Sequence, residues 1–453
     1  MKKVLTTSAF TLLCLIGIAQ TSPAIASWLR NTTNIMGRHY VSGNSTPIAD
    51  NVSANVQTVQ YSATSVYIST RGIPAYMTGP FLDGNPSLAS DQNAMFKFPL
   101  NPTKNTGNPV NTTGGNIGIF INGVALFDYR DGVSWKNSTN SLCGGPIKPP
   151  CMGDGVWNRD AIPAEKKGFD CSKGHPAMGN YHHHQNPSAF KLDLKVISTV
   201  CNLYDADGLY VIDSSKHSPL IGFAYDGFPI YGAYAYKNVD GSGGIIRMKS
   251  SFTLRNITSR TTYADGSTVT AGPNVSATYP LGYFREDYQY NTATASDYLD
   301  DHNGRFCVTP EYPNGIYCYF ATVDANWNSA YPYVVGPTFY GTKTASKVPS
   351  ITENVTTYSP SSIGVSNKKI SDIDISVFPN PTNDLVAIQI NDITKENMDI
   401  ALYDITGKLI QKTILYQGST IAYFDIQTLY SGAYIIKISS SNSTITKKIN
   451  IVK

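Results

Sequence analysis

The sequence predicts a mainly β protein, in which a large, loop-rich β domain is followed by a small C-terminal immunoglobulin-like β-sandwich. Three observations predict this fold class. The 453 residues include 30 Tyr and 17 Phe, and aromatic residues are favoured in pleated strands. The 37 Gly and 26 Pro supply turns between such strands. The apolar runs are strand-length and helical periodicity is almost absent, so few helices are expected.

The N-terminus is typical of a secretory signal peptide. Lys2 and Lys3 precede an apolar run over residues 4–19, and residues 24–26 offer a small-residue cleavage site. Residues 1–26 are therefore expected to be removed during export. The apolar run is too short to be a comfortable membrane span. No other apolar stretch approaches that length, so no transmembrane segment is expected in the mature chain.

The charge balance excludes some classes of partner. The chain has 35 Lys+Arg against 32 Asp+Glu, a formal net charge of +3, and only 15% of its residues are charged. A charge this small provides no electrostatic footprint for nucleic acid or for an anionic membrane surface. No nucleic-acid partner is expected.

Several common catalytic motifs are missing. The sequence lacks a Gly-x-Ser-x-Gly motif, a phosphate-binding Gly-rich loop and a His-Glu-x-x-His motif.

Six cysteines remain after removal of the signal peptide, and an even number in an exported protein favours disulfide bonds. Proximity in sequence predicts the pairs Cys143–Cys151 and Cys307–Cys318, which leaves Cys171 with Cys201. Other connectivities stay open, because sequence alone does not fix the pairing. There is no Cys-x-x-Cys pair, which disfavours a structural zinc site.

Composition divides the mature chain into three parts. Residues 27–345 are expected to form one large β domain, because strand-length apolar runs alternate with Gly, Asn and Asp-Gly turn signals. Residues 346–371 are rich in Ser, Thr, Pro and Asn and are expected to be a linker. Residues 372–453 alternate apolar and polar positions between clear turns, which fits a sandwich of about seven strands.

The stretch GNYHHHQNP, residues 179–187, contains three of the seven histidines. On a strand, His182 and His184 share one face, whereas Tyr181 and His183 share the other. The Cα atoms of His182 and His184 would be about 6.7 Å apart. Both imidazoles can therefore lean towards one ion, with each ring nitrogen about 2.0–2.1 Å from it. This His-x-His pair predicts a transition-metal site, with copper favoured and zinc next. His183 is expected to pack, to hydrogen-bond or to face solvent.

Two further histidines are candidate ligands for the same ion. His175 lies seven residues upstream of His182, and His217 begins the apolar block HSPLIGFAYDGFPIYG. For His217, a buried histidine at the end of a strand is the competing interpretation. Cys171 could serve as a soft ligand only if it is not in a disulfide bond.

Three residues are candidates for supporting the metal site from outside the ligand shell. Tyr181 precedes the histidine run, and Asp226 could fix a histidine tautomer by accepting its second ring N–H. A turn aspartate before Gly227 is a somewhat better interpretation of Asp226. His302 lies beside two aspartates in LDDHNGR, where an ordinary loop histidine is the alternative.

The histidine stretch resembles the YHYH domain family, which is named for Tyr-His-Tyr-His at this position. GNYHHHQNP followed by KHSPLIGFAYDGFPIYG matches the family pattern, except that His183 replaces the middle tyrosine. Further matching blocks extend the resemblance over roughly residues 116–341; they are NGVALFDYRDGVSW, WNRDA, LDDHNGRF and YPYVVGPTFYG. The family is largely uncharacterised, and its metal role is suggested mainly by the motif itself.

The C-terminal region resembles the sorting domain of proteins exported by the type IX secretion system. The matching blocks are FPNP at 378–381, YDITGK at 403–408, SGAY at 431–434 and the lysine-rich end. The resemblance implies export across an outer membrane, contact with the type IX machinery and removal of the tail. It also implies either attachment to surface lipopolysaccharide or release from the cell.

Two functional hypotheses from different classes stay open. The first is an exported metal-binding protein, which could be a metal-dependent oxidoreductase, with His182 and His184 in its centre. The second is a non-enzymatic surface module whose tyrosines contact glycans or other polymers while the histidines are structural. A hydrolase that activates water on the same metal would need an open coordination position. The sequence does not decide whether the protein is an enzyme.

Overall fold

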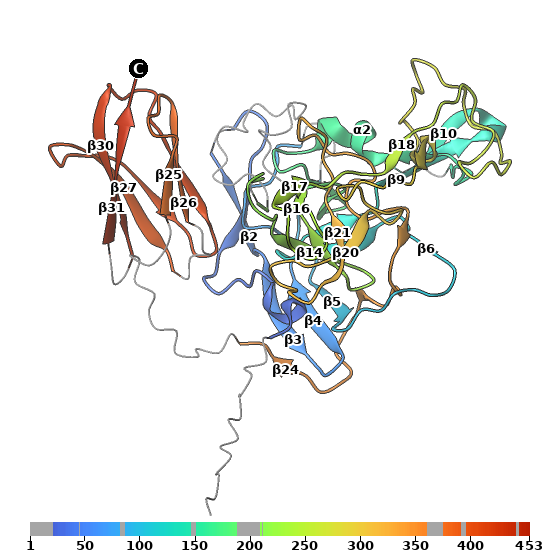
Figure 1. Cartoon of the computed structure of the whole chain (residues 1–453), viewed down its shortest axis with the longest axis horizontal. Helices are drawn as coiled ribbons and strands as arrows, with labels where there is room; N and C mark the ends of the chain where they lie inside the picture. The colour runs from blue at the N-terminus through green and yellow to red at the C-terminus, as the bar shows by residue number, and fades with distance from the viewer. Residues whose placement is uncertain are drawn as a thin grey trace, which may run out of the picture.

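The computed structural model of the full-length chain describes residues 21–44, 46–81, 87–145, 151–187, 209–210, 212–359, 375–390, 396–440 and 444–453. Within these ranges the protein is mainly β with a few short helices, as the sequence predicts (Figure 1). No helix in the described ranges has both the length and the apolar character that a bilayer crossing requires.

An eight-stranded sheet lies at the centre of the large domain, in the order β12-β13-β8-β7-β14-β15-β21-β20. Most neighbours are antiparallel, but β13 pairs with β8 and β15 pairs with β21 in parallel. β14 is buried along its whole length, as expected for an apolar strand covered on both faces. The strands are β7 (Asn116–Phe120), β8 (Ala125–Phe127), β12 (His175–Ala177), β13 (Asn180–His183), β14 (Leu220–Ala224), β15 (Pro229–Tyr231), β20 (Gly304–Cys307) and β21 (Ile316–Phe320).

A five-stranded sheet packs against this central sheet, in the order β23-β5-β4-β3-β24. Its strands are β3 (Val56–Tyr61), β4 (Ser65–Thr70), β5 (Ala94–Pro99), β23 (Ser346–Lys347) and β24 (Thr356–Thr357). Buried and half-buried positions alternate along β5, so one of its faces covers the core. Trp28 connects the two sheets, because its ring lies 5.7 Å from Phe98 of β5 and 5.2 Å from Phe223 of β14.

The remaining elements of the large domain are short. Three strands form the sheet β10-β9-β11, with β9 (Arg130–Lys136), β10 (Ser141–Gly144) and β11 (Asn158–Asp160). Two-stranded pairs are β1 (Met36–His39) with β2 (Ile48–Ser53), β6 (Val110–Asn111) with β22 (Thr338–Phe339), β16 (Tyr234–Tyr236) with β17 (Ile245–Arg247), and β18 (Phe252–Leu254) with β19 (Tyr288–Tyr290). The helices are α1 (Pro23–Ala26), α2 (Ala161–Glu165) and the 3-10 turns η1 (Asn137–Thr139), η2 (Lys166–Gly168) and η5 (Arg285–Asp287).

Both ends of the large domain extend beyond the boundaries expected from composition. At the N-terminal end, Ala24 and Ile25 of α1 are buried in the main core. In the full-length chain, the folded part therefore begins upstream of the cleavage site expected after residue 26. At the other end, β23 pairs with β5 and β24 pairs with β3. The first part of the expected linker is thus folded onto the large domain, because its short polar segments add edge strands to an existing sheet.

The C-terminal region is a seven-stranded sandwich in the described residues, as the alternation of apolar and polar positions predicts. One sheet contains β25 (Ile375–Phe378), β26 (Leu385–Ile390) and β29 (Ile421–Asp425). The other contains β27 (Met398–Asp404), β28 (Leu409–Leu415), β30 (Gly432–Ser439) and β31 (Thr444–Ile451). Inward-facing aliphatic side chains from both sheets form a core of their own.

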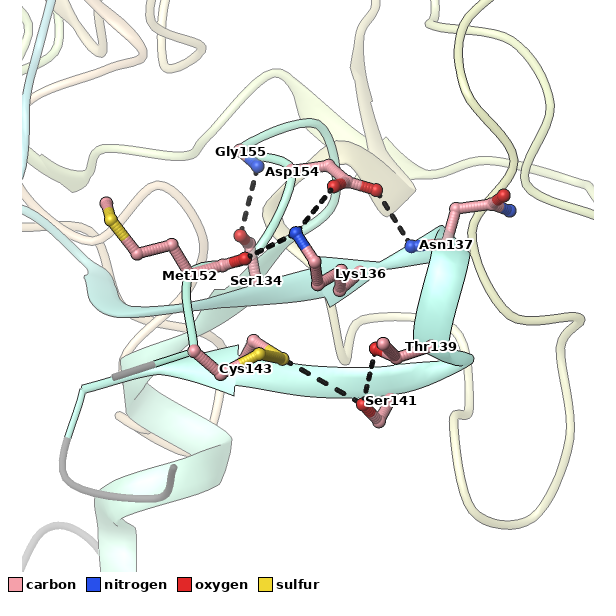
Figure 2. The surroundings of a disulfide bond; sticks show 10 residues. Ser134, Lys136, Asn137, Thr139, Ser141, Cys143, Met152, Asp154 and Gly155 are labelled. Carbon is pink, nitrogen blue, oxygen red and sulfur yellow. Dashed lines mark hydrogen bonds and ion pairs between the residues drawn. A yellow bond between two sulfur atoms is a disulfide. The ribbon is translucent and has the colours of Figure 1, made fainter. Parts of the chain in front are cut away.

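Cys143 and Cys151 form the disulfide bond that proximity predicts, with a Cα–Cα distance of 5.2 Å. Figure 2 shows how the segment after Cys151 is held against β9. The Lys136 ammonium donates to the Met152 carbonyl at 3.1 Å, and the Gly155 N–H donates to the Ser134 hydroxyl at 3.0 Å. The disulfide therefore closes a small unit built on β9 and β10.

The expected bond between Cys307 and Cys318 is absent, because both residues are buried free thiols. Cys307 pairs across the strands with Ile316, and Cys318 pairs with Arg305, so the two cysteines are diagonal neighbours. Diagonal positions lie about 7–8 Å apart, farther than the usual Cα separation of about 4.4–6.8 Å in a disulfide. Cys171 is disulfide-bonded, which removes it as a soft ligand; Cys201, its expected partner, lies outside the described residues.

Candidate metal centre

Three histidine side chains meet at one end of the central sheet. His175, His182 and His184 are all buried, and each offers a ring nitrogen within 4.8 Å of the other two. The Nε2 atom of His184 lies 3.1 Å from Nε2 of His182 and 3.5 Å from Nε2 of His175. In the described part of the chain, this is the one group of three or more His, Cys, Asp or Glu side chains close enough to share an ion.

The β12–β13 hairpin explains why these histidines meet. His175 on β12 is the direct cross-strand partner of His182 on β13, so their side chains lie on the same face of the sheet. Met178 and Gly179 form the tight turn, and both have positive φ angles, of 48° and 84°, as two-residue hairpin turns require. His184 follows His182 by two positions and shares its face, as strand alternation predicts.

Backbone carbonyls fix the ring tautomers of two of the histidines. Nδ1 of His182 lies 2.8 Å from the carbonyl oxygen of Asn180, and Nδ1 of His184 lies 2.7 Å from that of Asp128. A carbonyl oxygen only accepts hydrogen bonds, so each Nδ1 must carry the proton. A neutral ring in this state carries its lone pair on Nε2, which is the tautomer that binds metals through Nε2.

Glu165 is a fourth donor that the sequence did not reveal. Its Oε2 atom lies 3.2 Å from Nε2 of His175 and 3.2 Å from Nε2 of His184. Glu165 is the last residue of α2, whose start is capped by Asp160 because its carboxylate accepts the Ile162 N–H at 2.9 Å. The sequence contains one signal for this helix. Asp160 is a strong N-cap residue, and Pro163 suits the first helical turn.

The electrostatics of the group keep its acid ionised and one of its bases neutral. Burial raises the pKa of Glu165, but hydrogen bonds and charge from His175 and His184 outweigh it and hold that pKa well below its usual range. Burial, reinforced by the neighbouring His175 and His184, lowers the pKa of His182 well below its usual value. The metal-free site thus combines an ionised carboxylate with the neutral imidazole of His182.

Aromatic rings enclose the group on the histidine side. Phe127 of β8 stacks on His182 at a centroid distance of 3.8 Å and an angle of 18°. Phe169 meets the edge of His175 at 4.9 Å. The side chains of His175 and His184 are 6% and 3% exposed, whereas that of Glu165 is 21% exposed. The group is therefore closed around the histidines and opens to solvent on the Glu165 side.

Comparison with known families places this group in a recognised domain. The sequence profile of the YHYH protein family matches residues 95–332, which is more than half of the 453 residues. The chain belongs to the YHYH family. All four donors lie inside the matched region, and His183 stands where the YHYH motif has its second tyrosine.

A second profile, that of the secretion system C-terminal sorting domain, matches residues 376–453 of this YHYH protein. The tail marks the protein for export by the type IX secretion system to the cell surface or the extracellular space. A solved DUF3244 family protein from Bacteroides vulgatus, with an immunoglobulin-like β-sandwich fold, is 16% identical; the match covers 18% of this chain and 86% of that chain, with a TM-score of 0.16. No curated protein matches this chain.

The opposite face of β13 in the YHYH domain has a structural network. His183 is buried, and its Nε2 lies 2.7 Å from the Tyr76 hydroxyl. Tyr181, expected to support the metal site, instead donates its hydroxyl to Asp170 at 2.9 Å. Asp170 also accepts backbone N–H groups, including that of Gly174 at 3.1 Å. Tyr181 therefore holds the loop before β12, from the face of β13 opposite to His182.

Two predicted histidines lie outside the group. Nδ1 of His217 is 2.7 Å from the Ser218 carbonyl oxygen, and its ring packs on Tyr231. Nδ1 of His302 is 2.7 Å from the Thr338 hydroxyl. Because neither side chain joins the cluster of donors, His217 drops out of the candidate ligand set and His302 has no supporting role there.

Asp226 also lies apart from the donors. Its Oδ2 atom accepts the Tyr319 hydroxyl at 2.5 Å and the Gly341 N–H at 2.8 Å, and Oδ1 accepts the Phe228 N–H at 3.2 Å. These are the contacts of a buried turn aspartate, which is the alternative interpretation of this residue. The carbonyl oxygens of Asn180 and Asp128 take the role that the sequence suggested for Asp226.

Proposed function

We propose that this exported YHYH protein binds one transition-metal ion through His175, His182, His184 and Glu165. The observation that carries the proposal is that the Nε2 atoms of the three histidines and Oε2 of Glu165 lie close together. Four donors at about 2.0–2.1 Å from one tetrahedral ion stand about 3.3–3.4 Å apart. The separations are 3.1 and 3.5 Å from Nε2 of His184 to those of His182 and His175. They are 3.2 Å from Oε2 of Glu165 to His175 and to His184. These four distances are close to the tetrahedral value, and Glu165 would have to approach His182 to complete such a site.

The donor set favours copper, with zinc next. Imidazole nitrogens suit copper and zinc among other ions, and Cu²⁺ forms the most stable complexes in the divalent series. A single carboxylate among three imidazoles does not resemble the all-oxygen sites of Mg²⁺ or Ca²⁺. The absence of thiolate and thioether donors among the four residues argues against a site specialised for Cu⁺.

Metal analysis tests the proposal. The purified protein is expected to contain about one ion per chain after dialysis, measured by inductively coupled plasma mass spectrometry. The double variant His182→Ala/His184→Ala is expected to contain none. His217→Ala is the matched control and is expected to keep the ion, because His217 lies outside the donor group. A metal-free native protein, or equal metal in the double variant, would reject the proposal in favour of a structural histidine network.

We further propose that the site is redox-active when it holds copper. The support is the exposure of Glu165, which is the donor that an incoming ligand can reach or displace. A copper-loaded sample would lose its Cu²⁺ paramagnetic resonance signal with ascorbate and recover it in air. A signal that ascorbate leaves unchanged would restrict the protein to metal binding.

The fate of the sorting tail is a separate proposal. We propose that the tail is removed on export and that the mature domain is then attached to surface lipopolysaccharide. The profile match over residues 376–453 supports contact with the type IX machinery; attachment is the part that needs a test. Intact mass spectrometry of cell-surface protein is expected to show a truncated chain carrying a glycolipid adduct. A truncated chain without an adduct, found in the medium, would favour release.

A further inference from the structure

A cleft of about 410 Å³ lies between the five-stranded and the eight-stranded sheets. This volume is within the range of about 300–1,000 Å³ that is typical of small-ligand sites. Residues from both sheets line the cleft, among them Phe96 of β5, Ala125 of β8 and Asn180 of β13. None of the four metal-site donors is among the residues that line it, so the cleft is a separate feature of the YHYH domain.

Amide side chains line part of the cleft. Gln92, Asn116 and Asn180 all line it. The Asn180 amide makes no hydrogen bond to any described residue, so its donors and acceptor are available to a ligand. Gly72 lies between two of these amides with a φ of +73°, and a Cβ there would come within 2.9 Å of Gln92 and 3.9 Å of the Asn180 amide oxygen. A glycine at this position therefore keeps this part of the cleft open.

Cationic and aromatic side chains also line the cleft. Lys343 and Lys347 line the cleft, and no described lining residue is acidic. Neither lysine forms an ion pair with a described residue. Lys343 Nζ lies 5.9 Å from the ring centroid of Tyr225. Tyr225 is a buried aromatic residue of the cleft, and its ring centroid is 6.4 Å from that of Phe96.

We propose that this cleft binds an acidic saccharide, meaning a sugar ring that carries a carboxylate. Amide groups both donate and accept, which suits neighbouring ring hydroxyls. An aromatic ring can cover the apolar C–H face of a sugar, and unpaired lysines form charge-assisted hydrogen bonds with a carboxylate. A neutral sugar would leave both cations unused, and a simple anion would leave the amides unused. The inference goes beyond the metal site and does not depend on it.

The cleft and the metal site nevertheless share β13. Strand alternation puts the side chains of Asn180 and His182 on the same face, and Ala125 in the cleft is the cross-strand partner of His182. The backbone carbonyl of Asn180 fixes the His182 tautomer, and the side chain of Asn180 lines the cleft. A bound saccharide would therefore lie next to the strand that carries the ligands.

Calorimetry with the full secreted chain tests the proposal. The probes are trigalacturonate, its methyl ester and a neutral galactose trisaccharide. Trigalacturonate is expected to bind, and the two uncharged sugars are expected to bind at least about tenfold more weakly. The variant Lys343→Gln/Lys347→Gln is expected to lose about tenfold or more in affinity for trigalacturonate. Lys104→Gln is the matched control, since Lys104 lies over the Tyr340 ring at 5.5 Å and does not line the cleft.

Two further measurements separate this proposal from others. Chelation of the metal is expected to leave trigalacturonate binding unchanged, so a failed metal proposal would not remove it. Gln92→Ala is expected to weaken saccharide binding while metal content stays the same, because Gln92 lines the cleft and lies outside the donor group. Absence of trigalacturonate binding, or unchanged binding in the double lysine variant, would overturn the proposal. Equally tight binding of an oligoglutamate peptide would show a general anion site and would also overturn it.

Discussion

The Nε2 atoms of His182 and His184 lie 3.1 Å apart although the Nδ1 proton of each ring is already committed to a backbone carbonyl. Two nitrogen lone pairs at this distance repel each other unless a cation lies between them. Burial and the neighbouring histidines lower the pKa of His182 well below its usual value, which disfavours a proton on that ring, so a proton between the two nitrogens would have to come from His184. A metal ion that both nitrogens bind removes the repulsion, which is why this relationship supports a metal site.

Replacement of His175 tests the cross-strand contribution to the site. His175→Ala is expected to lower metal occupancy sharply, since it removes the one donor supplied by β12. His302→Ala is the matched control and is expected to leave occupancy unchanged, because His302 bonds to Thr338 instead. Elemental analysis of both variants after the same dialysis measures the effect. Equal occupancy in the two variants would contradict the assignment of His175.

Glu165→Gln removes a negative charge but keeps the size of the side chain. We expect metal affinity to fall by more than the roughly 10–100-fold that loss of an outer hydrogen-bond partner typically costs, because a ligand oxygen is weakened directly. Competition with a chelator of known affinity measures the change. Glu286→Gln is a suitable control, since Glu286 is a buried acid that bonds to Asn158 instead of the histidines. An unchanged affinity would leave the site with three histidine donors.

The metal-free protein is expected to lose stability in acid partly through His183. Burial lowers the pKa of His183 to about 3, whereas the unfolded value is about 6.5. Between these two values the unfolded chain binds more protons, so this contribution is full above about pH 6.5 and is lost as the pH falls towards 3. From pH 7 to pH 5 the loss is about 2 kcal/mol.

Urea unfolding of metal-free protein at pH 7 and pH 5 measures this contribution. All four tryptophans lie in the large domain, so their fluorescence follows that domain alone. His183→Gln cannot titrate and is expected to show a smaller difference between the two pH values than the native chain. The comparison concerns the pH difference, so a general destabilisation by the substitution does not affect it. Identical pH differences in the two chains would contradict the role of His183.

Cys307 and Cys318 are expected to be reduced in the purified protein. A hydrogen bond with the Cys318 thiol lowers the pKa of Cys307 to about 7 in the folded protein, but burial keeps that thiol from reagents. Alkylation without reductant is expected to label both residues in urea and neither in the folded protein, where both are buried. Peptide mapping identifies the labelled sites. An unlabelled pair in urea would mean that the two cysteines are oxidised.

The sequence predicted part of the candidate site because strand alternation is a local property. It placed His182 and His184 on one face, and the structure confirms this arrangement. The pairing of His175 with His182 needed the hairpin turn at Met178-Gly179, whose register a single sequence does not fix. Glu165 was missed because α2 has only five residues, too few to produce a helical period. His217 and Asp226 were candidates because they lie in a block close to the histidine motif. In the structure their side chains bond to Ser218 and Tyr319 instead, away from the four donors.

The large fold was predictable at the level of class and not of connectivity. Gly, Pro and aromatic content indicated many short strands, and the C-terminal alternation indicated the sandwich. The parallel pairing of β13 with β8 joins residues 57 positions apart, as in His182 with Ala125, and no local pattern encodes such a contact. The edge strands β23 and β24 were read as linker because two polar residues give no periodic signal.

All four donors of the proposed site lie within residues 165–184, so only short loops separate them. Closing short loops costs little conformational entropy, and the unfolded chain can therefore chelate the same ion with several of these side chains. Binding to the unfolded chain reduces the stabilisation that a ligand gives to the folded state. The ion would thus raise the unfolding temperature less than its affinity for the native protein suggests, and a denatured sample would still retain metal.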